Sequence, residues 1–246
     1  SCSLVGSEMC IRDRPYIGKE KNTQNYAEKV YRTYTCSFST NKDSLTMWNY
    51  YATSGSGVNL IFDFAWNLFE GSDISEVNNS SHLENDITIC RGLVLYQRMD
   101  KQKCIKALLD NLYEVYLQED TIEKCQSHIQ WAFKEAINNM RCFFKNDSFS
   151  CENEYRVILK IPEELLLEET TGQDGILKKG QFKRGNILIP YVDYKFKRDS
   201  LKEITLNPYV KEKESVFELG IRELLWQNKI HNVQIYRSAI PMRKYF

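Results

Sequence analysis

The sequence predicts an α+β fold, built from a mixed and mainly antiparallel sheet, a helical hairpin and a C-terminal helix. Three observations support this prediction. Short stretches rich in Val, Ile, Tyr and Phe alternate with turn residues, which is typical of strands. Two consecutive segments between positions 101 and 140 place apolar residues at helical spacing. A chain of 246 residues is long enough to bury one sizeable core.

The composition is balanced in charge. The chain has 33 Lys and Arg residues and 33 Asp and Glu residues, so no bulk field attracts it to nucleic acid or to a membrane. Hydrophobic residues make up 42% of the chain, which is typical of a packed globular protein. No apolar run approaches the roughly 18 residues that a membrane span needs. Nucleic acid is therefore a disfavoured partner, and no membrane partner is expected.

The eight cysteines are scattered, and none stands in a CxxC pair. No metal site is expected from this pattern. No export signal is visible in the sequence, so scattered cysteines fit reduced thiols and a cytoplasmic location is expected.

The first residues are set apart from the rest of the chain. Residues 4–13, which read LVGSEMCIRD, resemble the in-frame translation of a transposase adapter used in preparing sequencing libraries. We therefore expect residues 1–14 to be an adapter-derived artefact on a bacterial gene fragment of metagenomic origin. Residues 15–246 are expected to form a single α+β domain that lacks its native N-terminal strand and helix.

The first half of that domain is expected to run from strand to short helix, glycine turn and strand. The strand is predicted at 30–39 and the helix at 45–52, with Asp43 or Ser44 as its cap. An apolar strand at 58–64 follows the turn. The polar stretch that comes next predicts a surface loop at 70–86, which contains His82.

The second half is expected to contain the helical hairpin. After a strand at 87–99, a helix at 101–118 carries an apolar stripe of Ile105, Leu108, Leu109, Leu112 and Tyr116. A second helix is predicted at 122–140, with Asp120 and Glu123 in capping-box positions. Further strands are predicted at 148–161, 187–196, 201–206 and 232–240, and a helix at 210–228.

The stretch at 148–161 carries the candidate chemistry. Glu152, Glu154 and Arg156 are spaced i, i+2 and i+4, so on a strand they share one face, while Tyr155 and Val157 point the other way. The charge stands only at the mouth of an otherwise apolar strand. The glutamates are either a reactive pair of carboxylates or a strand end whose charge Arg156 neutralises.

Two other groups of residues remain open between a structural and a functional role. Trp48 and Tyr51 are three apart on one helical face, where they form core or the floor of a ligand cleft. Four cations stand around two glycines, where they bind phosphate or lie on a solvated hairpin tip: Lys178, Lys179, Lys183 and Arg184.

Several short motifs together resemble a family. They are, in order, residues 34–39, Met47-Trp48, residues 50–52 with Gly57, Phe144-Lys145, residues 152–156 and residues 236–243. Their order and gaps resemble the bacterial domain of unknown function 2971. This resemblance covers the chain from about Val30 to its C-terminus. It indicates the family, but it does not indicate which reaction, if any, the protein catalyses.

The order of a Ser-x-Ser strand and a later Glu-x-Glu strand also resembles ADP-ribosyltransferases, with Phe38 where Thr is common. The resemblance implies a related fold and an enzyme that uses NAD as its substrate. It makes Glu154 the catalytic carboxylate and Glu152 the residue that orients the acceptor. It implies that the NAD-binding cleft is lined by Tyr34, Ser37, Ser39, Trp48, Tyr51 and Arg156.

Other functions stay open. The chain could be a non-catalytic nucleotide-binding or sensing module of a bacterial defence or toxin locus, or a structural interaction domain. Asp147, Glu152 and Glu154 with Lys160 faintly resemble a metal-dependent nuclease, although their spacing fits poorly. The expected partner is a nucleotide or a protein substrate, and the sequence predicts no oligomeric state. No Walker loop, dinucleotide fingerprint, HExxH or GxSxG motif is present.

Overall fold

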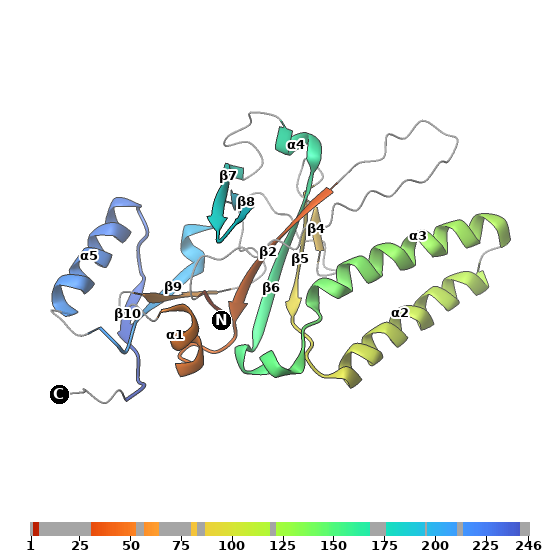
Figure 1. Cartoon of the computed structure of the whole chain (residues 1–246). Coiled ribbons are helices and arrows are strands. Elements are labelled where there is room, and N and C mark those ends of the chain that lie inside the picture. Colours follow the sequence, from red (N-terminus) through yellow and green to blue (C-terminus); the bar gives the residue numbers. More distant parts are fainter. Residues whose placement is uncertain are drawn as a thin grey trace. The chain divides into compact units, whose positions relative to one another are not determined.

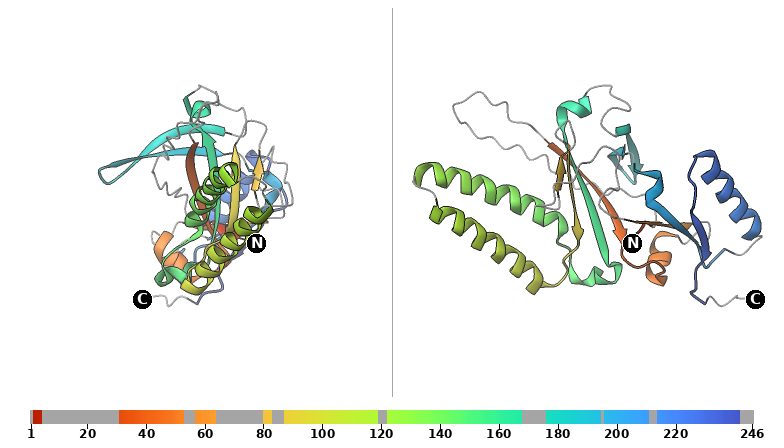
Figure 2. Two further views of the ribbon diagram at one scale, coloured as in Figure 1. Left: turned by 90° about the vertical axis from the view of Figure 1, so that its right-hand side faces the viewer. Right: turned by 180° about the vertical axis from the view of Figure 1, so that it is seen from behind.

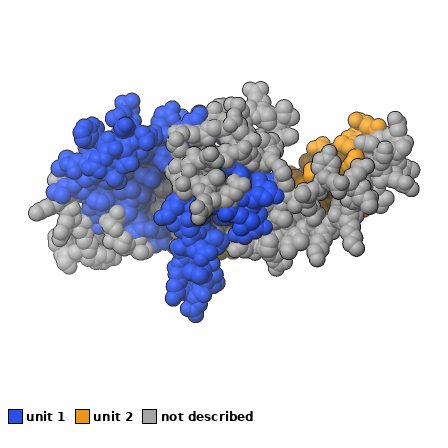
Figure 3. All heavy atoms as spheres, turned by 90° about the horizontal axis from the view of Figure 1, so that it is seen from above, with its two compact units in different colours: residues 1–91, 155–246 blue, residues 92–154 orange. Residues whose placement is uncertain are grey.

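The computed structural model describes residues 2–4, 31–52, 57–63, 80–82, 87–118, 122–167, 176–194, 196–210 and 214–241. These residues form two compact units (Figures 1 and 3). Unit 1 comprises residues 1–91 and 155–246, and unit 2 comprises residues 92–154. The boundary between the units falls inside two strands, near Arg91 and near Glu154.

Unit 1 is built on an eight-stranded sheet. Its strand order is β10-β9-β3-β1-β2-β6-β5-β4. The strands are β1 (Cys2–Leu4), β2 (Tyr31–Ser39), β3 (Val58–Phe62), β4 (Ser80–His82), β5 (Thr88–Leu93), β6 (Glu154–Pro162), β9 (Leu201–Leu206) and β10 (Gln234–Arg237). Strand pairs β1–β2, β1–β3, β3–β9 and β4–β5 are antiparallel, and the pair β9–β10 is parallel. The predicted α+β class with a mainly antiparallel sheet is confirmed.

The remaining elements of unit 1 are a hairpin and several helices. Strands β7 (Ile176–Arg184) and β8 (Ile187–Tyr194) form a separate two-stranded sheet (Figure 2). Gly185 turns the hairpin with a φ of 59°, a conformation that glycine adopts without steric cost. The helices are α1 (Leu45–Tyr51), α4 (Glu163–Leu167), α5 (Glu214–Gln227) and the short η3 (Arg198–Ser200).

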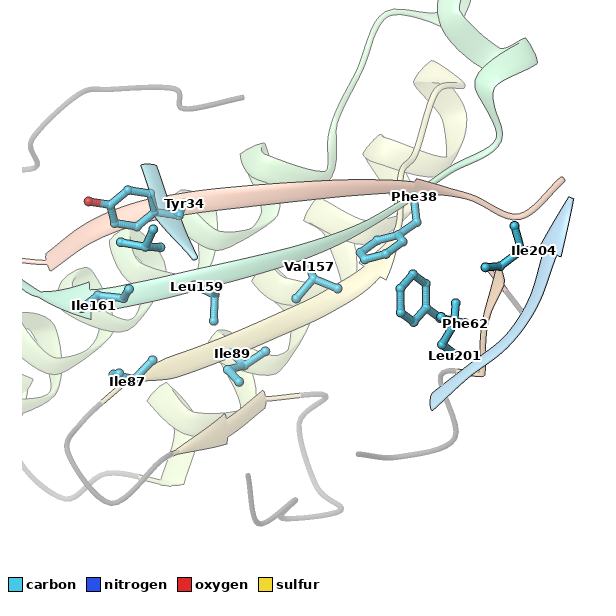
Figure 4. Packing of buried hydrophobic residues seen from close by; sticks show 11 residues of the cluster. Tyr34, Phe38, Phe62, Ile87, Ile89, Val157, Leu159, Ile161, Leu201 and Ile204 are labelled. Carbon is cyan, nitrogen blue, oxygen red and sulfur yellow. The ribbon is translucent and has the colours of Figure 1, made fainter. Parts of the chain in front are cut away.

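The core of unit 1 follows from the alternation along its strands. Val157, Leu159 and Ile161 lie on one face of β6 and pack with Tyr34 and Phe38 of β2, Ile87, and Ile89 of β5 (Figure 4). Phe62 meets Phe38 edge to face, with their ring centroids 6.0 Å apart. Aromatic pairs in this geometry add about 1 kcal/mol beyond the burial of their area. These residues therefore form one side of the core of unit 1.

Asp43 connects α1 to the segment after β10 through hydrogen bonds. Its carboxylate accepts a hydrogen bond from Trp48 Nε1 at 2.7 Å, from Ser238 Oγ at 2.8 Å and from the backbone N–H of Ala239 at 2.8 Å. Ser44 is the N-cap of α1, but its side chain makes no capping hydrogen bond. The turn before α1 was therefore predicted correctly. Asp43 stabilises this turn by accepting hydrogen bonds from Trp48, Ser238 and Ala239 instead of capping the helix.

Replacing Asp43 by alanine is expected to lower the free energy of unfolding by about 2 kcal/mol, because the buried indole N–H of Trp48 loses its acceptor. Urea unfolding monitored by tryptophan fluorescence measures this change. Asp193→Ala, at an exposed position of β8, is the matched control and should change the value by less than about 0.5 kcal/mol. Equal effects of the two substitutions would contradict the role of Asp43.

Unit 2 contains the helical hairpin, which is confirmed. Its helices α2 (Arg98–Gln118) and α3 (Ile122–Met140) lie side by side (Figures 1 and 2). Two short 3-10 helices follow, η1 (Arg141–Phe143) and η2 (Asp147–Glu152). Helix α2 has no buried residue, and two residues of its predicted apolar stripe, Leu109 and Tyr116, are exposed. Residues 119–121, with the predicted cap Asp120, lie outside the described residues.

Three boundary predictions are wrong. The strand expected at 148–161 begins at Glu154, and the strand expected at 87–99 ends at Leu93. His82 was expected in a surface loop, but it lies in β4 and pairs with Thr88. Within residues 1–14, Cys2–Leu4 pair with β2 and β3 as β1, and the adapter origin of that segment stays a prediction.

Five of the cysteines that the structure describes are free thiols: Cys36, Cys90, Cys104, Cys142 and Cys151. Burial raises the pKa of Cys36 to about 12. Among the helices that the structure describes, none is long and apolar enough to cross a membrane.

Candidate functional site

Two glutamates and a lysine meet inside unit 2. Lys145 Nζ donates hydrogen bonds to Glu152 Oε2 at 2.5 Å and to Glu154 Oε2 at 3.1 Å. The two carboxylate side chains are 9% and 4% exposed, and the lysine side chain is 24% exposed. We call these three side chains the Lys145 cluster. Burial of charged groups is costly unless they are paired, and here one ammonium group pairs with both carboxylates.

The backbone around Leu95 brings Lys145 to the glutamates. Leu95 donates its N–H to Phe143 O at 2.8 Å and accepts from the N–H of Lys145 at 3.1 Å. The neighbouring Val94 donates its N–H to Glu154 O at 2.9 Å. A single extended segment is thus hydrogen-bonded to the chain on both sides of the cluster, which fixes the distance between Lys145 and Glu154.

Side chains complete the positioning. The hydroxyl of Tyr96 accepts a hydrogen bond from the N–H of Glu154 at 2.9 Å. The ammonium of Lys145 lies 5.0 Å from the centroid of the Phe149 ring, where a cation–π attraction adds about 0.5 to 1 kcal/mol. Lys101 Nζ donates to the backbone oxygen of Lys145 at 2.5 Å. These contacts hold the ammonium and the start of β6 in one arrangement.

Asn153 makes the bend that lets both glutamates reach the same ammonium. It closes η2 with a left-handed backbone, at φ 42° and ψ 55°, and its N–H donates to Ser150 O. Glu152 therefore ends a 3-10 helix while Glu154 opens β6, and the two do not share a strand face as expected from the sequence. The prediction of one strand through both residues is wrong because of this single residue.

Asn153→Val is expected to destabilise unit 2 by about 1 to 2 kcal/mol, because a β-branched residue is strained at positive φ. Asn153→Gly is the matched control and should stay within about 0.5 kcal/mol of the parent, since glycine tolerates this conformation. Urea unfolding measures both. A valine variant as stable as the glycine variant would contradict the left-handed bend.

The electrostatics of the cluster favour a charged lysine. Burial alone would lower the pKa of Lys145, but the hydrogen bond that Lys145 donates to Glu152 and the attraction of both carboxylates outweigh burial and raise the pKa above its ordinary value of 10.5. Burial also raises the pKa of the Tyr96 hydroxyl, so that group stays neutral at physiological pH. The three side chains of the cluster together carry one more negative than positive charge.

The aromatic residues predicted to stack on nicotinamide lie in unit 1, and two of them are interior. Tyr34 is 4% exposed within the core, and Trp48 is 1% exposed with its indole bound to Asp43. This burial favours the core role that the sequence analysis left open for Trp48. Tyr51 differs, because 41% of it is exposed.

The remaining predicted residues also belong to unit 1. Ser37 is half-buried on β2, and the buried Ser39 accepts a hydrogen bond from the N–H of Asn41 at 3.2 Å. Arg156 is half-buried on β6. Their assignment to a common NAD-binding cleft with Glu152 and Glu154 stays a prediction, since that cleft would join residues of both units.

The basic segment forms the β7–β8 hairpin, and its cations do not act alike. Lys178, Lys183 and Arg184 are exposed. Lys179 instead donates to the backbone oxygen of Leu166 at 3.0 Å. A lysine that donates to backbone carbonyls has a structural role. This segment is therefore better described as a solvated hairpin than as a site where four cations bind phosphate.

Lys145 and Tyr96 are the residues that the sequence analysis missed as parts of the site. Lys145 appeared there only in a family motif, Phe144-Lys145, and seven positions separate it from Glu152. That motif is the signal that could have identified it. Within the described residues, no group of three or more His, Cys, Asp or Glu side chains is placed to hold a metal ion.

Residues 47–157 match the family described as protein of unknown function (DUF2971). This match confirms the family resemblance, and it includes all of unit 2 with the Lys145 cluster. Neither a curated protein nor a solved structure matches the chain.

Proposed function

We propose that this chain, which carries the DUF2971 domain at residues 47–157, is an NAD-using enzyme of the ADP-ribosyltransferase type, with Glu154 as its catalytic carboxylate. The observation that carries the proposal is the Lys145 cluster, in which two almost fully buried carboxylates share one ammonium group. The order of Ser37-x-Ser39 before Glu152-x-Glu154 supports the choice of NAD among substrates.

The chemistry needs a fixed negative charge. The bond between nicotinamide and ribose breaks with its electron pair leaving on the nicotinamide nitrogen, so positive charge develops on the ribose carbon. A carboxylate held in a water-poor environment stabilises that charge without reorganising, a type of effect worth about 100-fold or more in rate. Glu154, which is 4% exposed and held by Lys145 and Val94, supplies such a carboxylate.

The second carboxylate, that of Glu152, activates the acceptor by removing its proton. Water or a nucleophile on a protein substrate forms a new bond to the ribose carbon and must lose a proton. Glu152 accepts that proton and then passes it to solvent, as a general base does. The products are nicotinamide, the ADP-ribosylated acceptor and one proton. Lys145 is a positioning residue, since its ammonium holds one oxygen of each carboxylate.

A second candidate function rests on the same geometry. An ammonium bound to both carboxylates is also the arrangement of a structural ion-pair network. In that case the domain binds a nucleotide without turning it over, or acts only as an interaction domain. The wider role in a bacterial defence or toxin locus belongs to this alternative.

The experiment measures nicotinamide release from NAD by the whole chain, with and without EDTA, together with NAD binding by calorimetry. Release that ignores EDTA supports the proposal, because the mechanism uses no metal. Binding without release supports the nucleotide-binding module. Neither release nor binding by the folded chain would overturn the proposal and leave the cluster as an ion-pair network.

A further inference from the structure

Helix α2 presents an apolar face to solvent. Leu109, Tyr113 and Tyr116 are spaced i, i+4 and i+7, so they lie on one side of the helix. They are 49%, 60% and 43% exposed, and the two tyrosine rings stack with their centroids 6.5 Å apart. Large exposed apolar groups at helical spacing are typical of a surface that packs against a partner.

The adjoining side of α2 already has its partner. The half-buried residues of this helix recur at helical spacing and form the side that packs in the hairpin with α3: Lys101, Cys104, Ile105, Leu108 and Leu112. None of them is fully buried, because two helices alone enclose little volume. A hairpin with a second apolar side gains a proper core when two hairpins pack into a four-helix arrangement.

The charges along α2 identify the partner. Lys103 and Lys106 are exposed in its N-terminal half, and Asp110 and Glu114 are exposed in its C-terminal half. A second α2 that runs antiparallel brings the basic half of each helix opposite the acidic half of the other. A parallel arrangement would instead place like charges together, which disfavours it. The helix is thus complementary to its own reversed copy.

We infer that α2 is a homodimer interface, in which a second copy of this chain packs its α2 antiparallel about a two-fold axis near Leu108 and Leu109. This register places Lys103 opposite Glu114 of the other copy. The Tyr113 and Tyr116 rings of each copy then lie against the lysine stems in the basic half of the other, where apolar and cation–π contacts add to the charge pairing.

The size of the surface is adequate for this role. A helix of 21 residues is about 30 Å long, so two antiparallel copies with their neighbouring α3 helices can approach the roughly 1,200 Å² of a specific interface. The ion pairs already formed within α2 do not prevent its charged side chains from pairing with a second copy. Lys106 with Asp110 at 2.5 Å and Lys103 with Asp100 at 3.8 Å are solvent-exposed, and such pairs contribute little.

A charge exchange between two chains tests the inference. One chain carries Lys103→Glu with Lys106→Glu, and the other carries Asp110→Lys with Glu114→Lys. We expect the parent to sediment as two chains and each variant as a single chain of 29.0 kDa. We expect an equimolar mixture of the two variants to return to two chains, because each acidic segment then faces a basic one.

The controls separate the interface from folding. Circular dichroism checks that each variant keeps its helix content. Arg222→Glu breaks a similar exposed i, i+4 pair on α5 and should leave the dimer intact. A parent that sediments as one chain at micromolar concentration overturns the inference. So does a mixture that stays monomeric while both variants are folded, since the charges would then pair with something other than a second α2.

Discussion

Replacing Lys145 by methionine is expected to lower the free energy of unfolding by about 3 kcal/mol or more, the largest change among the substitutions considered for unit 2. Methionine keeps the length of the side chain and most of its packing. It removes the ammonium that donates to Glu152 and Glu154, whose side chains are 9% and 4% exposed. The two buried carboxylates then lose a hydrogen-bonded partner and repel each other.

Urea unfolding of the variant and the parent at neutral pH measures this loss. Arg222→Met is the matched control, because Arg222 is also paired with a carboxylate, that of Glu218, but has a side chain that is 55% exposed. The control should lose less than about 1 kcal/mol. If both variants lost the same amount, the Lys145 cluster would not be a buried charge network.

The effect of Lys145 should also depend on pH in a defined direction. Its pKa in the folded chain is raised above the ordinary value of 10.5, so the folded state holds its proton more tightly than the unfolded state. The stability that this proton contributes is fully present below pH 10.5 and is lost as the pH rises through the folded pKa. The difference between parent and Lys145→Met should therefore shrink above that pH.

Glu154→Gln is expected to reduce the rate of nicotinamide release by about 100-fold or more, because the amide cannot stabilise positive charge on the ribose. The amide oxygen can still accept the hydrogen bond of Lys145, so the fold keeps this contact. Initial rates at saturating NAD measure the loss. Glu223→Gln, at an exposed position of α5, is the control and should keep the parent rate.

The substitution Glu152→Gln distinguishes the proposed role of Glu152 from that of Glu154. In the proposed mechanism it removes the base that accepts the acceptor's proton, so its defect should be relieved as the pH rises and the nucleophile loses its proton more easily. The defect of Glu154→Gln should not be relieved in this way. Identical pH profiles for the two variants would contradict the separate roles.

The fold class and most elements could be predicted because they depend on local patterns. The apolar residues of β6 predicted a strand, and Val157, Leu159 and Ile161 lie in the core of unit 1. The helical spacing between 101 and 140 likewise identified α2 and α3. The same spacing placed Leu109 and Tyr116 in the apolar stripe of α2, and the structure shows that both are exposed. Spacing shows which residues share a face, and it does not show whether a partner covers that face.

The candidate site was predicted in part, for a different physical reason. The two glutamates were visible as charges at the end of an apolar strand. Their geometry was not, because the left-handed conformation of Asn153 replaces the expected strand with the end of a 3-10 helix. The partner Lys145 reaches the glutamates through a turn fixed by the backbone of Leu95, which no spacing rule encodes.

The most direct test measures two quantities on one preparation of Glu154→Gln, the free energy of unfolding and the rate of nicotinamide release from NAD. If the Lys145 cluster is a catalytic site, the unfolding free energy should stay within about 1 kcal/mol of the parent while release is lost. A variant that is destabilised but still releases nicotinamide at the parent rate would contradict this account and make Glu154 a structural member of an ion-pair network.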